Sequence, residues 1–327
     1  MSSDIPTIDF GRFERSEKDG TQLASEIDAA LSTVGFLHLV NHGIEQGKID
    51  ESFQWVRAKS RKFFSLSPTD KESMYPRSEA YDCGYVSLGQ EKVRGKNCMK
   101  ECVDINGSSG GEMDRILPGF HGFMVQFHQE CAILIQKLLK CLSVALGLGD
   151  EDALGQHHTD SLFNLNLIHY PEVAAEQLRS GSAVRLPAHS DPGSLTLLFQ
   201  QKVGGLEIAD MSSTCETATV KVEQTAKFIA VEPQPATILV NVGYLLMRWS
   251  NGRWKNTVHR VMAPPVSGNT DSVDTVPERY STAFFSFPGP DTVIEPLDAC
   301  ISVENPRRWA PIIAGKYLRK KISSMYS

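Results

Sequence analysis

The second half of the chain is a series of short β-rich segments with no helical pattern between them, and this feature limits the possible folds most. The segments carry β-branched and aromatic residues and are separated by turn residues. In chain order they read FNLNLIHY, AVRLPAH, SLTLLF, GLEI, KFIAVE, ATILVNVG, TVHRVM, YSTAFFSF and TVIEP. Parallel strands need a long crossover connection, usually a helix, whereas antiparallel strands need only turns. We therefore expect a mainly β fold with flanking helices, in which antiparallel strands form a jelly roll or a barrel.

Helices are expected on either side of this β-rich part. Between residues 118 and 146 apolar residues recur at three- and four-residue steps, which predicts a long amphipathic helix. The tail over residues 305–326 reads as a basic helix packed on the outside. Residues 81–111 lack clean periodicity and are expected to form loops over a binding site or a surface. The predicted organisation is an N-terminal α/β region over 1–117, followed by the long helix, the β core and the C-terminal helix over 118–327.

Composition excludes several classes of partner. The 327 residues carry a formal net charge of -6 and no long run of Lys or Arg, so nucleic acid is not an expected partner. No apolar run approaches the length that spans a membrane, and the N-terminus lacks the pattern of a signal peptide. Seven cysteines without a CxxC pair fit reduced thiols. We expect a cytoplasmic protein that acts on a small molecule, and the sequence predicts no oligomeric state.

His189, Asp191 and His259 are candidates for a metal site. Residues two apart on an extended strand project to the same face, so His189 and Asp191 can reach one ion. Such a pair often arises by chance in a polar turn, but here it opens the apolar run SLTLLFQ and so stands at a strand border. His259 lies in the β-branched run NTVHRV and supplies a third ligand. Two imidazoles and one carboxylate form the facial triad of non-haem Fe(II) oxygenases, which leaves positions on the metal for O2 and a 2-oxo acid.

Arg279 and Ser281 follow on the next expected strand and are again two apart. Their side chains therefore point the same way, and together they make a clamp for a carboxylate. An Arg in a strand is otherwise most often part of a surface ion pair, which contributes little to stability. The position of Arg279 downstream of a candidate metal ligand favours the clamp.

Several ordered motifs resemble one family. HSDPGSLTLLFQQKVGGLEI, SNGRWKNTVHRV and RYSTAFFSFP resemble the isopenicillin N synthase-like branch of the Fe(II)/2-oxoglutarate-dependent dioxygenases, and so do the N-terminal IPTIDF, GFLHLVNHGI and KFFSLSPTDK. The resemblance implies a double-stranded β-helix core with catalytic Fe(II) at His189, Asp191 and His259. It also implies 2-oxoglutarate bound through Arg279 and Ser281, and O2 as the oxidant. The chain is further similar to fungal secondary-metabolism members, including tropolone ring-expanding dioxygenases, with thymine-type hydroxylation as a rival.

Two departures from the family pattern bear on the site. Many relatives carry Asn-x-Tyr beside 2-oxoglutarate, where this chain has Ile168 and Tyr170 at the matching positions. Tyr170 is a cofactor-binding candidate, whereas Ile168 leaves the anchor on the metal side open. The spacings between the motifs are also longer than is usual for the branch, in agreement with polar stretches at 210–225 and 265–278. We interpret these stretches as loop insertions that either cover the active site or only decorate it.

Four further residues are candidates for substrate binding. Arg185 shares a strand face with His189 and could hold an anionic or oxygen-rich substrate, with a surface ion pair as the alternative. Asn166 and Leu198 are candidates of the same kind, and ordinary barrel packing is the alternative for Leu198. Phe287 would floor an apolar pocket, unless it packs in the core.

The implied reaction oxidises a small organic metabolite by hydroxylation, desaturation or radical ring rearrangement, and it releases succinate and CO2. An oxidase of the isopenicillin N synthase type, which uses no 2-oxoglutarate, is one alternative, and the missing Asn near Tyr170 supports it. A non-catalytic protein that binds a small molecule on the same fold is the other alternative. The intact metal ligands argue against that second alternative.

Overall fold

The computed structural model describes residues 5–13, 15–55, 63–76, 83–107, 109, 111–159, 162–264 and 275–326. Its strands are β1 (Thr7–Asp9), β2 (Phe36–Val40), β3 (Gly84–Val86), β4 (Lys92–Val93), β5 (Lys96–Asn97), β6 (Glu101–Asn106), β7 (Asn164–Tyr170), β8 (Val173–Ala174), β9 (Leu186–His189), β10 (Leu195–Gln200), β11 (Leu206–Asp210), β12 (Lys227–Ala230), β13 (Ile238–Val242), β14 (His259–Val261), β15 (Thr275–Val276), β16 (Arg279–Phe285), β17 (Val293–Ile294) and β18 (Ile312–Ile313). Its helices are α1 (Glu17–Thr33), α2 (Gln46–Gln54), α4 (Pro68–Met74), α5 (Phe120–Ala145), α6 (Ala175–Arg179), α7 (Thr219–Thr225), α8 (Tyr244–Trp249) and α9 (Ala314–Ser323). Short 3-10 helices lie at Phe10–Arg12, Gly111–Arg115, Gly155–His157 and Asp298–Cys300.

Two sheets face each other and form the β core. The larger sheet has eight described strands in the order β1-β2-β13-β10-β16-β7-β6-β3, and the smaller has four in the order β12-β11-β14-β9. Within both sheets the strands pair antiparallel, except that β1 and β2 are parallel. Leu239 and Ala283 of the larger sheet share one buried cluster with Leu206 and Val261 of the smaller. This arrangement is the jelly-roll core that the sequence predicts.

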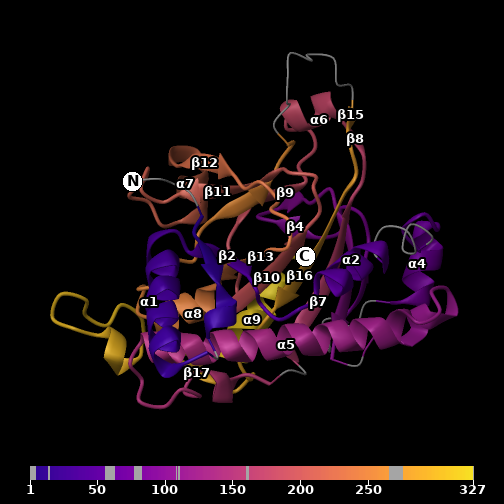
Figure 1. The fold of residues 1–327 in the computed structure, drawn as a ribbon. Helices are drawn as coiled ribbons and strands as arrows, with labels where there is room; N and C mark the ends of the chain where they lie inside the picture. The colour runs from indigo at the N-terminus through magenta and orange to yellow at the C-terminus, as the bar shows by residue number, and fades with distance from the viewer. Residues whose placement is uncertain are drawn as a thin grey trace.

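Helices cover the other face of the larger sheet. α5 runs across that sheet, and α1 packs against α5 (Figure 1). The main hydrophobic core lies between these helices and the larger sheet, and it includes Phe127 and Ile135 of α5 together with Leu165 and Leu167 of β7. Because β7 has the helices on one face and the β core on the other, all of its residues are buried. This burial holds in place the strand that carries several residues of the site.

The long predicted helix is confirmed, and the C-terminal one is shorter than predicted. The sequence predicts a helix over 118–146, and α5 covers Phe120–Ala145. Gly147 follows it with a φ of 65°, a left-handed conformation that glycine adopts without steric cost. At the C-terminus, α9 begins only at Ala314. Pro311 lies just before it, and a proline disfavours the helical conformation at the residue that precedes it.

The prediction of loops over residues 81–111 is wrong. β3 and β6 lie there and extend the larger sheet beyond β7, so strands from 1–117 and from 118–327 belong to the same sheet. The charged side chains of β6, Glu101 and Asp104, are nevertheless buried, and Glu101 Oε2 lies 2.6 Å from Lys71 Nζ. Because a buried ion pair stands where an alternating pattern needs an apolar residue, β6 has no period-two signal in the sequence.

The two predicted insertions differ in what the structure describes of them. Residues 210–225 form the end of β11, a turn and α7, and they connect β11 to β12. Most of the stretch 265–278 lies outside the described residues, and its described end includes β15, which pairs with β8. Among the described helices, none is long and apolar enough to cross a membrane.

Candidate metal centre and the two hollows beside it

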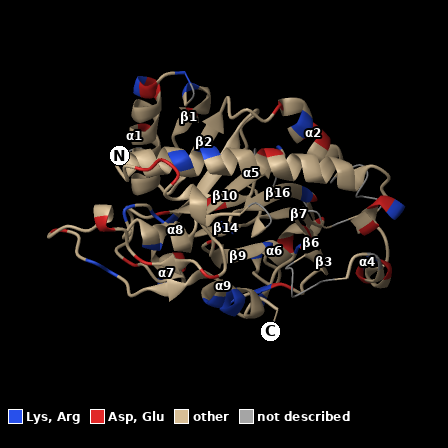
Figure 2. Ribbon diagram, turned by 90° about the horizontal axis from the view of Figure 1, so that it is seen from below, with Lys and Arg blue, Asp and Glu red and all other residues tan. Residues whose placement is uncertain are grey.

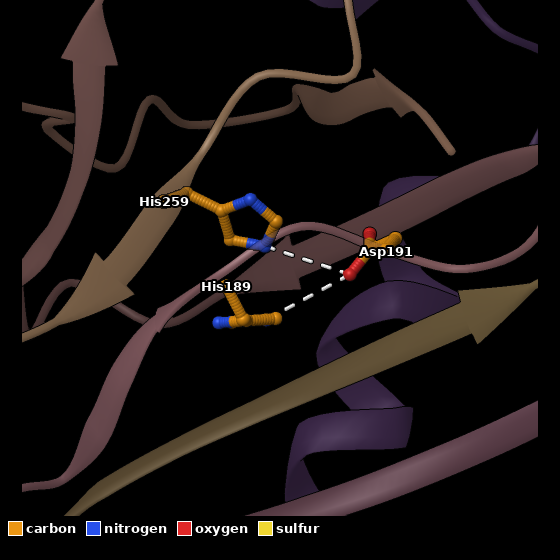
Figure 3. Close-up of side chains that lie close together, drawn as sticks. All are labelled: His189, Asp191 and His259. Atoms are coloured by element: carbon orange, nitrogen blue, oxygen red, sulfur yellow. Dashed lines mark ion pairs between the residues drawn. The ribbon is translucent and has the colours of Figure 1, made fainter. Parts of the chain in front are cut away.

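His189, Asp191 and His259 lie together inside the β core, and we call them the triad. His189 ends β9, and His259 begins β14 directly opposite His189 in the antiparallel pair. The Nε2 atoms of His189 and His259 lie 3.7 Å and 3.6 Å from Asp191 Oδ1 (Figure 3). One ligand atom from each residue lies within 4.8 Å of the other two. The structure thus brings together the three residues that the sequence singles out.

Each imidazole of the triad is oriented by a backbone carbonyl. His189 Nδ1 donates to the carbonyl of Pro187 at 2.9 Å, and His259 Nδ1 donates to the carbonyl of Thr257 at 3.1 Å. A carbonyl can only accept, so Nδ1 carries the hydrogen and Nε2 keeps a free lone pair. Burial, followed by the neighbouring His259, lowers the pKa of His189 to about 3. His189 is therefore neutral at physiological pH, as a metal ligand must be.

The carboxylate of Asp191 is held by two polar side chains that the sequence analysis missed. Oδ2 accepts hydrogen bonds from Thr196 Oγ1 at 2.6 Å and from Asn241 Nδ2 at 2.7 Å, which leaves Oδ1 for an ion. Burial alone would raise the pKa of Asp191, but the imidazoles and these two hydrogen bonds outweigh it and lower that pKa. Asn241 gave a signal that could have been used, because it is a polar residue in the apolar run ILVNV of β13.

A pair of glycines fixes the turn after Asp191. The amides of Tyr244 and Leu245 donate to the carbonyls of Asp191 and Gly193 at 2.8 Å and 3.0 Å. A Cβ atom added to Gly243 would lie only 2.2 Å from the Gly193 carbonyl oxygen. The start of α8 therefore packs directly against the metal turn, and only glycine allows this approach.

The donor set of the triad fits Fe(II). Two neutral imidazole nitrogens and one carboxylate oxygen converge from one side, which is the arrangement of a facial triad with open positions opposite. The backbone and side-chain hydrogen bonds described above leave one ligand atom free on each residue. Outer partners of this kind orient the ligands of metal sites.

A small inner hollow of about 60 Å³ extends from the triad to Arg279. The side chain of Arg279 is 1% exposed, and it donates from Nη1 to Ser281 Oγ and from Nη2 to Gln200 Oε1, both at 3.1 Å. Its Nε has no partner, and no acidic side chain among the described residues pairs with it. A buried guanidinium that lacks a counter-charge fits the carboxylate of a ligand.

The register of β7 and β16 orders the residues along the two hollows. Tyr170 lies opposite Arg279 at the inner end, and Ile168 lies opposite Ser281 in the next row on the same face. Ile168 lines both hollows, so it stands beside the triad where many relatives have Asn. Its apolar side chain offers no hydrogen bond to a ligand on the metal. Asn166 follows two residues away, on the same face.

A larger outer chamber of about 930 Å³ meets the inner hollow at His189 and Asp191. Asn166 and Phe287 line this chamber, whereas Leu198 lines the inner hollow and Arg185 lines neither. The side-chain oxygen of Asn166 is buried and has no hydrogen-bond partner. The chamber is further lined by the insertion, with Met211 and residues 214–219, and by Tyr317, Lys321, Ile322, Ser324, Met325 and Tyr326 at the C-terminus. The insertion at 210–225 thus forms a wall of the chamber.

Charged side chains of the outer chamber lie on elements that the sequence analysis left as loops or as an external helix. Lys100 Nζ pairs with Glu91 Oε2 at 2.7 Å, and both side chains are buried and line the chamber. Lys and Arg gather on α9 (Figure 2), and Lys321 of that helix reaches the chamber. Lys100 directly precedes β6, so its position near the site could have been predicted only from the pairing of that strand, which the sequence did not reveal.

Comparison with known proteins links this site to one family. Residues 5–116 match the family described as "non-haem dioxygenase in morphine synthesis N-terminal", and residues 159–288 match the "2OG-Fe(II) oxygenase superfamily". The 2-oxoglutarate-dependent dioxygenase frbA of Dothideomycetidae sp. (strain 11243) is 32% identical over 90% of this chain and 88% of its own. The proline hydroxylase buaE of Petromyces alliaceus is 30% identical over 99% of this chain and 100% of its own.

A solved structure matches the whole fold. Full-length T7H of Neurospora crassa, in complex with alpha-KG and thymine, is 31% identical and has a TM-score of 0.82, with 98% of this chain and 97% of that chain covered. The same protein with alpha-KG alone gives a TM-score of 0.83. That protein holds the 2-oxo acid and the small molecule together on a fold that superposes on this one.

Proposed function

Since the chain belongs to the 2-oxoglutarate and Fe(II) oxygenase superfamily, we propose that the triad holds Fe(II) and that Arg279, Ser281 and Tyr170 hold 2-oxoglutarate. The enzyme is a 2-oxoglutarate-dependent dioxygenase, and it uses Fe(II), 2-oxoglutarate and O2. The observation that carries the assignment of residues is the convergence of three free ligand atoms where the two hollows meet. The names of the relatives support this activity over an oxidase that works without 2-oxoglutarate.

Each part of the site has a separate task in this proposal. When bound, Fe(II) with 2-oxoglutarate supplies the oxidation of a C–H bond, with release of succinate and CO2. Arg279 binds the distal carboxylate of 2-oxoglutarate and Leu198 contacts its carbon chain, because both line the inner hollow. Thr196 and Asn241 keep Asp191 Oδ1 directed at the metal. The substrate reaches the metal from the opposite side, through the outer chamber.

The lining of the outer chamber indicates the kind of substrate. Phe285 and Phe287 offer apolar ring surface, and Asn166 offers a side-chain oxygen without a hydrogen-bond partner. A small organic molecule with an apolar ring and a hydrogen-bonding group fits such a lining. The curated relatives come from fungi and include a proline hydroxylase, which favours a role in fungal secondary metabolism. The seven cysteines all lie in the described part of the chain and form no disulfide, which supports a cytoplasmic location.

The test is to incubate the Fe(II)-loaded protein with 2-oxoglutarate in air and to measure succinate. Thymine, L-proline and small phenols are added one at a time, and products are identified by mass spectrometry. We expect one chemical class to raise succinate above its background in step with an oxidised product, and Asp191→Ala to lose both signals. If the unsubstituted, iron-loaded protein consumes no 2-oxoglutarate under any condition, the assignment of the triad and the clamp fails.

A further inference from the structure

Arg185 is a buried cation without an acidic partner close to the inner hollow. It precedes β9, the strand that ends on His189, and its side chain is 1% exposed. Nη2 donates to the carbonyl of Pro277, whereas Nε and Nη1 have no partner. No carboxylate among the described residues forms an ion pair with it. The surface ion pair that the sequence left as the alternative role is therefore not present in the described part of the chain.

Arg185 and Arg279 face the same aromatic ring. Their guanidinium carbons lie 5.9 Å and 5.1 Å from the centre of the Tyr170 ring. Burial, followed by the positive charge of Arg279, lowers the pKa of Arg185 to about 10. Both arginines nevertheless remain charged at physiological pH. Tyr170, itself 1% exposed, thus lies beside two cations in a region closed to solvent.

Two neighbouring buried cations without a carboxylate are costly for the fold. An isolated charge removed from water destabilises a protein strongly unless an opposite charge or a full set of hydrogen bonds compensates it. The ring of Tyr170 attracts each guanidinium through its face, but a cation–π contact offsets only part of that cost. The site is therefore arranged for an anion that the described residues do not supply.

We propose that Arg185 is a positioning residue for 2-oxoglutarate, which acts behind Tyr170 as a second positive charge for the distal carboxylate. The inference rests on the proposed function of Arg279 as the direct contact of that carboxylate. Arg185 does not line the inner hollow, so its effect passes through the ring of Tyr170 and through the electrostatic field. The proposal assigns Arg185 to the co-substrate and not to the substrate. Selectivity for a dicarboxylic 2-oxo acid then depends on both Arg185 and Arg279.

The experiment measures binding without turnover, by calorimetry on the Fe(II)-loaded protein in the absence of O2. Two ligands are compared: 2-oxoglutarate, and 2-oxopentanoate, which has the same carbon chain but no distal carboxylate. Arg185→Met is expected to weaken 2-oxoglutarate binding roughly ten- to fiftyfold, as one unit charge at about 7–10 Å does at an effective dielectric constant of about 20. Binding of 2-oxopentanoate should weaken clearly less, because its one carboxylate lies on the metal side of the hollow, farther from Arg185 than the distal carboxylate of 2-oxoglutarate. Arg185→Lys keeps the charge and should retain most of the affinity.

Arg279→Met is the matched control and separates this inference from the proposed function. If Arg279→Met leaves 2-oxoglutarate affinity unchanged, the clamp is wrong whatever Arg185 does. If Arg279→Met weakens binding but Arg185→Met does not, or if Arg185→Met weakens both ligands equally, the role of Arg185 is structural and the inference is overturned.

Thermal unfolding without 2-oxoglutarate provides a second measurement on the same variants. Because Arg185→Met removes an uncompensated buried charge, it is expected to raise the melting temperature of the ligand-free protein. A lower melting temperature would mean that Arg185 stabilises the fold, and this would contradict the inference. Arg185→Gln serves in the same two assays if the methionine variant does not fold.

Discussion

The inner hollow and the outer chamber meet at the triad but are built in different ways. Apart from Asp191, every residue that lines the inner hollow belongs to a strand of the two facing sheets. The outer chamber takes much of its lining from the insertion around Met211, from α8 and the segment between α8 and β14, and from the end of the chain around Tyr326. The inner hollow is also far smaller, about 60 Å³ against about 930 Å³.

This difference separates what the fold determines from what the loops determine. In the inner hollow, the antiparallel register sets Arg279 opposite Tyr170 and Ser281 opposite Ile168. A shift of one residue would turn all of these side chains to the other face, so the co-substrate site is as fixed as the sheet. The outer chamber has no such constraint, because loops tolerate changes in length and sequence. We infer that the co-substrate site belongs to the fold and that the substrate site is specific to this chain.

The largest effect is expected from Asp191→Ala, which removes the only anionic ligand of the triad. The variant should lose Fe(II) binding and all 2-oxoglutarate turnover, because two neutral imidazoles do not provide the facial triad. Metal analysis after anaerobic loading measures the first loss, and succinate release measures the second. Asp298→Ala is the matched control, because the side chain of Asp298 is 97% exposed and is not one of the triad residues. Iron retention by Asp191→Ala equal to that of the control would rule out the proposed centre.

A smaller effect of the same kind is expected from Asn241→Leu. The substitution removes the 2.7 Å hydrogen bond to Asp191 Oδ2 and leaves the three ligands in place. Loss of such an outer partner weakens metal affinity by roughly 10–100-fold. A competition titration with a chelator measures the change in Fe(II) affinity. Asn251→Leu is not a suitable control, because Asn251 Nδ2 donates hydrogen bonds to several backbone carbonyls and its loss would disturb the fold. An unchanged Fe(II) affinity would mean that the lining of the inner hollow tolerates substitution as well as the loops of the outer chamber are expected to.

The sequence predicts the inner hollow well for a physical reason. Arg279 and Ser281 are two apart on β16, so period-two alternation alone places both on one face. His189 ends β9 and Asp191 follows two residues later, so the same spacing brings the second pair together at the border of a strand. The jelly roll itself follows from strands that succeed one another without helices between them. What the alternation does not give is the distance between strands, so the meeting of His259 with His189 depends on the observed pairing of β14 with β9.

The sequence predicts the outer chamber poorly, and two residues explain why. Lys100 reaches the chamber only because β6 joins the sheet, and the buried ion pairs near that strand remove its apolar alternation. Lys321 reaches it because the short α9 packs at the chamber, although its sequence is that of a solvated basic helix. Long-range packing decides both positions, and no local pattern records it.

The smallest predicted effect sharpens the contrast between the two hollows through stability. Asn166 lines the outer chamber with a buried side-chain oxygen that has no partner, and an unsatisfied buried polar group costs about 1–3 kcal/mol. Asn166→Leu should therefore raise the free energy of unfolding of the ligand-free protein by about 1 kcal/mol, measured by urea denaturation. Affinity for 2-oxoglutarate should stay within about twofold, because Asn166 does not line the inner hollow and removes no charge from it. A gain in stability together with a loss of substrate-dependent succinate release would identify Asn166 as a group kept for the substrate at the expense of the fold. A loss of stability would instead show that the amide supports the chamber wall, and a loss of 2-oxoglutarate affinity would show that the two hollows are not independent.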